Sequence, residues 1–105
     1  MAKWDNKITE DLFKAVLALR DIKEAKLFFR DLLTEAEIFE FSKRWQAAQM
    51  LDENITYTEI KQATGLSSRT IARIAKWLNK GMGGYKLILN RIGHQHNPSF
   101  EKRLC

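Results

Sequence analysis

The sequence predicts an all-α fold of about six helices, and three observations support this prediction. Apolar residues recur along most of the chain at the i, i+3 and i+4 spacing of one helix face. Several of these segments begin with a residue pair of the kind that caps helix N-termini. Residues that break helices are few, with one proline and five glycines among 105 residues.

The first two helices are predicted at residues 6–19 and 22–32, and Asp21 with Glu24 fits an N-cap and its reciprocal partner. Both helices are rich in large apolar side chains, which either form a core shared between two subunits or pack inside one subunit. The largest apolar residues of this region are Trp4, Phe13, Leu17, Phe28 and Phe29.

Two capping boxes predict where the next helices begin. Thr34 with Glu37 precedes a long amphipathic segment at residues 35–51, and the sequence of residues 56–59 opens a short helix at 57–64. In this motif the threonine hydroxyl accepts a hydrogen bond from a free backbone N–H, and the glutamate reaches back to the cap residue.

The last two helices are predicted at residues 68–79 and 85–91. Ser67 or Ser68 is the cap of the fifth helix, and the glycines of residues 81–84 separate it from the sixth. We expect residues 1–92 to form one domain and residues 93–105 a C-terminal tail.

Several classes of protein are disfavoured by the composition. Cys105 is the single cysteine, so it has no partner for an internal disulfide. No apolar run approaches the roughly 18 residues that cross a bilayer, and residues 1–7 lack the apolar stretch of a signal peptide. We therefore expect a cytoplasmic protein with no membrane association.

We expect neither a metal site nor catalytic activity. His94, His96 and Cys105 lie in the predicted tail, and their spacing does not bring metal ligands together. The glycines of residues 81–84 lack the following Lys-Ser/Thr pair of a phosphate loop, so they are interpreted as a helix stop. No Ser/His/Asp or Cys/His set has supporting sequence context.

The charge is distributed unevenly along the chain. Residues 1–66 contain 10 lysines or arginines and 12 aspartates or glutamates, a net charge of −2. Residues 67–105 contain 8 basic residues against one glutamate, a net charge of +7, which makes the chain +5. A basic half on a near-neutral scaffold is typical of a polyanion binder, and the alternative is a solubilising surface.

The spacing around Gly65 predicts a helix-turn-helix. Two short helices that cross at a wide angle need a small residue at the turn, where the backbone can adopt a positive φ. They also need apolar contacts at fixed offsets, and Ile60, Leu66, Ile71 and Ile74 lie five before and one, six and nine after the glycine.

The polar residues of this unit suit double-stranded DNA. Arginine can bond guanine O6 and N7 in the major groove, and hydroxyl groups can contact base edges or phosphates. The alternative is a helical protein-interaction module whose basic face binds an acidic partner without a specific DNA site. The predicted DNA-binding residues are Tyr57, Thr58, Lys61, Ser67, Ser68, Arg69, Thr70, Ala72, Arg73 and Lys76.

Residues 32–89 resemble the Trp-repressor superfamily and, within it, the Trp-repressor-related YerC/YecD type. The asparagine, spaced glycines and tyrosine of residues 79–85 resemble the YerC/YecD type specifically. The matching residues are Leu33-Thr34, Glu37, Arg44, Tyr57-Thr58-Glu59-Ile60, Thr64-Gly65, Thr70-Ile71-Ala72-Arg73 and Leu78-Asn79-Lys80-Gly81-Met82-Gly83-Gly84-Tyr85.

The resemblance implies a six-helix, intertwined homodimer with interlocked N-terminal helices. Each subunit would present one helix-turn-helix, and the pair would act as a transcription regulator, with repression the expected outcome. Double-stranded DNA and a second copy of the chain are therefore the expected partners.

The resemblance also implies a ligand pocket that contains Thr34, Arg44 and Arg73, in which two arginines and a hydroxyl suit a carboxylate. Ile74 and Trp77 stand where the repressor has small residues, and Trp77 fills volume that its ligand would need. We expect no cofactor, and tryptophan is a doubtful candidate for a small-molecule effector. The alternative for the two arginines is phosphate contact or an ion pair with a nearby glutamate.

Overall fold

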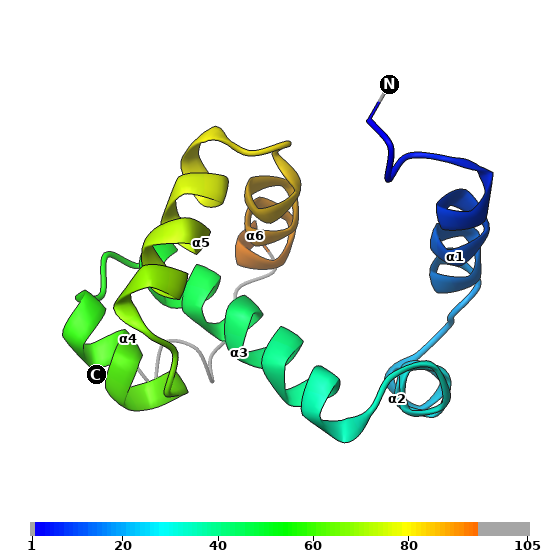
Figure 1. The fold of residues 1–105 in the computed structure, drawn as a ribbon, viewed down its shortest axis with the longest axis horizontal. Helices are drawn as coiled ribbons and strands as arrows, with labels where there is room; N and C mark the ends of the chain where they lie inside the picture. The colour runs from blue at the N-terminus through cyan, green and yellow to red at the C-terminus, as the bar shows by residue number, and fades with distance from the viewer. Residues whose placement is uncertain (1, 95–105) are drawn as a thin grey trace. The chain divides into compact units, whose positions relative to one another are not determined.

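A computed structural model describes residues 2–94, and within these residues it contains six helices and no strand (Figure 1). The all-α prediction is confirmed. None of the helices in this part of the chain is long and apolar enough to cross a membrane. The helices are α1 (Lys7–Leu17), α2 (Ile22–Leu32), α3 (Glu35–Asp52), α4 (Tyr57–Thr64), α5 (Ser68–Lys80) and α6 (Gly84–His94).

The helix boundaries agree with the predicted ones to within a few residues. The helices α2 and α4 have the predicted bounds, whereas α1 ends two residues early at Leu17. The helix α6 continues past residue 91 to His94, because Gly93 weakens a helix without ending it. The boundary expected between residues 92 and 93 stays a prediction.

The predicted caps are present at the N-termini of α2 and α3. The backbone N–H of Glu37 donates to Oγ1 of Thr34 over 3.1 Å, and the N–H of Thr34 donates to the Glu37 carboxylate over 3.0 Å. The Asp21 carboxylate accepts a hydrogen bond from the N–H of Glu24 over 2.9 Å. The Glu24 carboxylate accepts from the backbone N–H of Arg20, and not from that of Asp21 as a capping box requires. Each cap satisfies donors that a helix N-terminus leaves free.

The chain divides into two compact units, Met1–Phe39 and Glu40–Cys105, which we call unit 1 and unit 2. In unit 1, neither α1 nor α2 has a buried residue. Its aromatic contacts are local: the rings of Trp4 and Phe13 are 6.4 Å apart, and those of Phe28 and Phe29 are 5.4 Å apart.

Unit 2 contains the hydrophobic core of the described residues. Side chains from α3, α4, α5 and the turn between α4 and α5 form one cluster. The helix α6 joins this cluster through Tyr85, whose ring stacks on Trp45 of α3 at 6.2 Å with an interplanar angle of 24°. The members of the cluster are Ala47, Ala48, Ile60, Leu66, Ile71 and Ile74.

Candidate nucleic-acid interface

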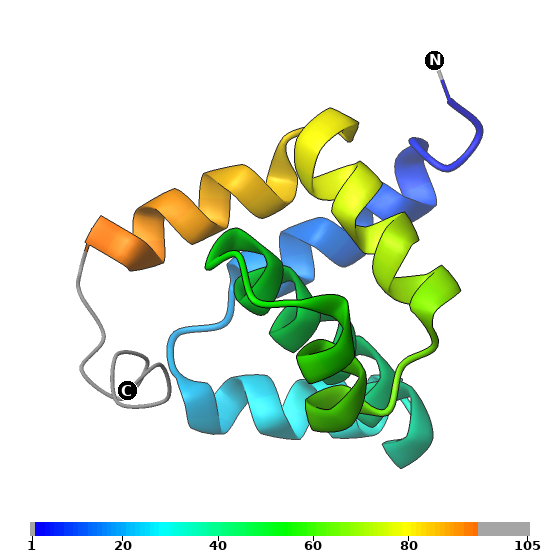
Figure 2. The same ribbon diagram turned by 90° about the vertical axis from the view of Figure 1, so that its left-hand side faces the viewer.

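Figure 2 shows the short connection between α4 and α5. Its first residue is Gly65, the C-cap of α4. Its φ of 75° and ψ of 4° lie in the left-handed region, which glycine enters without strain. A Cβ at this position would meet no atom within 4 Å, so the dihedral angles, and not lack of space, require glycine. The N–H of Gly65 donates to the carbonyl of Lys61 over 2.8 Å and closes α4.

Thr64 ties the two sides of the turn together. Its hydroxyl donates to the carbonyl of Ile60 over 2.7 Å and accepts from the N–H of Leu66 over 3.1 Å. The side chain is almost fully buried, and both hydrogen bonds offset the cost of removing it from water. Sequence reasoning missed this role, although a short hydroxyl residue directly before a turn glycine was an available signal.

The apolar contacts predicted between the two helices are present. Ile60, Ile71 and Ile74 have 0% exposed surface, and Leu66 is buried beside them. The spacing around Gly65 therefore predicted the contacts of the helix-turn-helix correctly. The same contacts hold α5 so that its opposite face is open to solvent.

The cap of α5 is Ser67, which decides between the two serines that the sequence left open. Its hydroxyl oxygen accepts from the N–H of Thr70 over 3.1 Å, and its hydroxyl donates to Oγ1 of Thr70 over 3.1 Å. Both hydroxyl groups are thus engaged in the cap, whereas Ser68 is exposed. Ser67 and Thr70 therefore stabilise the N-terminus of α5 in the absence of any ligand.

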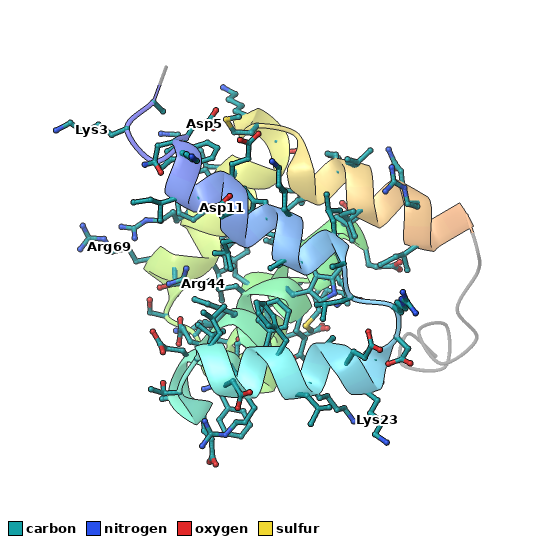
Figure 3. All side chains as sticks on the ribbon, turned by 90° about the vertical axis from the view of Figure 1, so that its right-hand side faces the viewer. Lys3, Asp5, Asp11, Lys23, Arg44 and Arg69 are labelled. Carbon is teal, nitrogen blue, oxygen red and sulfur yellow. The ribbon has the colours of Figure 1, made fainter. Side chains whose placement is uncertain are left out.

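The remaining predicted contact residues lie at the surface of unit 2. Arg69 extends from α5 away from the ribbon (Figure 3). Thr70 is half-buried, as expected of a residue at the edge of the core-facing side. The exposed residues are Tyr57, Thr58 and Lys61 on α4 and Ser68, Arg69, Ala72, Arg73 and Lys76 on α5.

The basic residues of this surface have no carboxylate partner in residues 2–94. The helix α5 contains no aspartate or glutamate. The salt bridges found in this part of the chain involve other cations, so the charges of α4 and α5 are not neutralised by them. These salt bridges are Arg30–Glu35 at 3.4 Å, Arg44–Glu40 at 3.5 Å and Lys86–Asp52 at 3.8 Å.

The residues of the predicted ligand pocket are divided between the units. Thr34 belongs to unit 1, and its hydroxyl accepts from and donates to Glu37 in the capping box. Arg44, Arg73 and Trp77 belong to unit 2. Arg44 pairs with Glu40, which is the alternative that the sequence left open for it, whereas Arg73 is exposed without an ion pair in the described part.

Arg44 also lies close to aromatic rings. Its guanidinium carbon is 5.8 Å from the centre of the Phe41 ring, a cation–π contact. Burial raises the pKa of the Tyr85 phenol above its ordinary value, and the charge of Arg44 opposes this with a smaller effect. Tyr85 therefore stays neutral near pH 7 and acts here as an aromatic packing residue.

The structure groups no set of three or more potential metal ligands within residues 2–94. His96 and Cys105, two of the three residues considered for a metal, lie outside the described residues. The contacts of α4 and α5 are thus those of a packed helix-turn-helix with a basic outer surface.

Comparison with protein families covers most of the chain. The Trp repressor protein family matches residues 7–93. The chain is 37% identical to the uncharacterised protein YerC of Bacillus subtilis over 100 residues. This alignment covers 95% of the chain and 96% of YerC.

Two solved structures share the fold. A TrpR-like protein from Eubacterium eligens superposes with a TM-score of 0.83 at 42% identity and covers 87% of this chain and 94% of its own. A candidate Trp repressor from Staphylococcus aureus superposes with a TM-score of 0.81 at 34% identity, and the match covers 89% and 96% of the two chains. These likenesses confirm the fold class that the sequence resemblance implied.

Proposed function

The chain belongs to the Trp repressor protein family, of the YerC type, and we propose that it is a transcription regulator that binds specific double-stranded DNA and represses genes. The single observation that carries this proposal is the helix-turn-helix of α4 and α5, whose outer surface has unpaired cations. Members of this family act as regulators and not as enzymes, and we assign no catalytic residue. A regulator of this kind works in the cytoplasm.

The chemistry of α5 supports contact with the major groove. Arg69 and Arg73 lie in its first two turns, where a recognition helix meets base edges. A guanidinium bonds guanine O6 and N7 through two parallel hydrogen bonds, and we propose this role for both arginines. Ser68 and Ala72 lie on the adjacent exposed surface, where a hydroxyl and a methyl group can contact bases.

The chemistry of α4 supports contact with the DNA backbone. Tyr57, Thr58 and Lys61 are exposed in its first turns. Their hydroxyl and ammonium groups donate to phosphate oxygens, and such contacts fix the register of a protein on the duplex without reading sequence. We propose an indirect positioning role for Ser67 and Thr70, because their cap holds the start of α5, where backbone N–H groups can bind a phosphate.

We propose that the functional unit is a homodimer. The helices α1 and α2 have amphipathic sequences, yet neither has a buried residue in the single chain. Ile8 and Leu17 are 81% and 83% exposed. They belong to a larger set of exposed apolar side chains on these helices, of the kind that marks a protein–protein interface. A second copy that covers these helices would give two reading helices related by twofold symmetry.

We propose that tryptophan is not the effector. Ile74 is fully buried, and the large Trp77 side chain follows three residues later on α5. Both side chains are larger than the residues that the repressor has at these positions. Isothermal titration with tryptophan should detect no binding tighter than about 1 mM, and tighter binding would contradict this proposal.

Duplex binding by matched variants tests the proposed function. Arg69→Ala and Arg73→Ala should each weaken binding to a preferred duplex by about 1–3 kcal/mol, because each removes a bidentate base contact. Lys23→Ala is the control, since Lys23 is an exposed cation of α2 outside the helix-turn-helix (Figure 3). If neither arginine variant changes the affinity, the assignment of α5 as the reading helix is wrong. If an acidic protein binds where no duplex does, the protein-interaction alternative is correct.

A further inference from the structure

Residues 81–84, which we call the glycine joint, connect α5 to α6 (Figure 1). The joint lies at the opposite end of α5 from Arg69. Its spaced glycines and the tyrosine that follows them stand out in the sequence, yet none of these residues is among the proposed DNA contacts. Their contacts within unit 2 indicate a different role.

Two of the three glycines of the joint are required by its geometry. A Cβ on Gly81 would overlap the carbonyl oxygen of Trp77, and the N–H of Gly81 donates to this same oxygen over 2.9 Å. Gly83 has a φ of 91°, which lies in the region that favours glycine. Gly84 has no positive φ, and a Cβ there would meet no atom within 4 Å. The glycine joint is therefore a defined turn.

The start of α6 is fixed to α3 immediately after the joint. The ring of Tyr85 stacks on Trp45, and it packs against the buried cluster of unit 2. Nζ of Lys86 lies 3.8 Å from the Asp52 carboxylate, a weaker contact because both side chains are partly exposed to water. Through the joint, these contacts of α6 with α3 also hold the C-terminal end of α5.

A shift at the C-terminal end of α5 reaches the reading residues at the other end. Ile74 is fully buried and lies between Arg69 and Gly81. At 1.5 Å per residue, Arg69 is about 7.5 Å and Gly81 about 10.5 Å from Ile74 along the axis. If α5 tilts about Ile74, a displacement of about 1 Å at Gly81 moves the backbone of Arg69 by roughly 0.7 Å. Binding groups need to be held within about 0.5 Å of their productive positions, so this movement is large enough to matter.

Resting on the proposed function, we propose that Gly81 and Tyr85 are positioning residues for sequence-specific DNA binding. They set the tilt of α5, and thereby the places of the Arg69 and Arg73 guanidinium groups. Two parallel hydrogen bonds to a base edge depend strongly on direction. A lysine on its flexible stem attracts a phosphate over a wider range of positions. The glycine joint therefore controls discrimination between DNA sequences more than the affinity for DNA as such.

Alanine variants of two glycines test this role, and the control comes from the same turn. The affinity of the full chain is measured at one salt concentration for its preferred duplex and for a random duplex. In Gly81→Ala the backbone must move by roughly 1 Å before the new Cβ and the Trp77 oxygen reach van der Waals contact. The ratio of preferred to random affinity should therefore fall by at least about tenfold. Gly84→Ala should leave this ratio unchanged, because a Cβ has open space there.

A second pair of variants tests the contact between α6 and α3. Tyr85→Leu removes the stacking on Trp45 and should also lower the ratio, whereas Tyr85→Phe keeps the aromatic ring and should preserve it. Circular dichroism and urea unfolding verify that each variant is folded under the binding conditions. If Gly81→Ala does not fold, the two tyrosine variants decide the question.

The outcomes separate a positioning role from a purely structural one. A loss of folded protein lowers both affinities by the same factor, whereas a loss of positioning lowers the affinity for the preferred duplex alone. If folded Gly81→Ala and Tyr85→Leu keep the full ratio, or lose both affinities equally, the positioning role is wrong while DNA binding stands. If the unmodified chain prefers no duplex over the random one, the proposed function is wrong and the positioning role falls with it. A lower ratio in these two variants, with both controls unchanged, supports the positioning role.

Discussion

The helix-turn-helix region and the two N-terminal helices differ in how far their apolar side chains are buried. All seven buried apolar residues of the described chain belong to α3, α4, α5 or the turn between α4 and α5, whereas α1 and α2 contribute none. The first region thus obtains its core from its own chain. The second has large apolar side chains on both of its helices that one copy of the chain leaves exposed.

In one copy of the chain, the buried apolar residues lie in unit 2, whereas α1 and α2 have none. The core of unit 2 is formed by side chains that approach from three helices and close on one another. The exposed apolar side chains of α1 and α2 stabilise the protein only when another surface covers them and removes them from water. We therefore expect changes in α1 to alter self-association and changes in α4 or α5 to alter unfolding.

The largest expected effect comes from placing a charge on α1. Leu17→Glu should weaken self-association by at least about 100-fold, because each of two copies loses about 1.5–3 kcal/mol of apolar burial. Sedimentation equilibrium measures the mass, which should correspond to two chains before the change and to one after it. Leu17→Met is the matched control and should remain dimeric.

The mass of the unmodified chain tests whether α1 and α2 form a dimer interface. If the unmodified chain sediments as a single copy at every concentration, α1 and α2 do not form the dimer, and their exposed surface needs another explanation.

The next effect concerns the core of unit 2. Ile60→Ala should lower the free energy of unfolding by about 2–5 kcal/mol, because Ile60 has no exposed surface and leaves a cavity. Urea unfolding followed by circular dichroism measures the loss. A loss below about 1 kcal/mol would mean that the buried cluster does not stabilise the helix-turn-helix as described.

The smallest effect concerns the turn. Gly65→Ala should cost about 1–2 kcal/mol from the left-handed backbone alone, since a Cβ meets no atom there. Gly65→Asn should cost less, because asparagine enters the left-handed region more readily. Urea midpoints of the two variants give the order, and equal losses would argue that contacts of the added side chain, and not the dihedral angles, dominate.

The local parts of the fold were predictable from the sequence. Capping pairs such as Thr34 with Glu37 act within one helical turn, so residues three positions apart reveal them. The contacts of Ile60 with residues after Gly65 follow from fixed offsets around a single turn. The exposure of Arg69 and Arg73 follows from their position opposite the buried face of α5.

Interactions between distant residues were not predictable in the same way. The stacking of Tyr85 on Trp45 joins residues 40 positions apart, and no local pattern places them together. The salt bridge of Arg44 with Glu40 was one of several alternatives, since an arginine can also bind phosphate or a ligand. The predicted pocket from Thr34 to Trp77 depends on how units 1 and 2 combine, and it stays a prediction.

Selection of duplexes from a random pool by the purified chain measures sequence-specific binding itself. We expect enrichment of a palindrome whose half-sites lie about one helical turn, roughly 34–36 Å, apart, because two symmetric recognition helices read the same bases. Arg69→Ala should relax the preference at one base pair in each half-site. A pool that stays random under conditions where the unmodified chain is folded and dimeric would contradict sequence-specific binding.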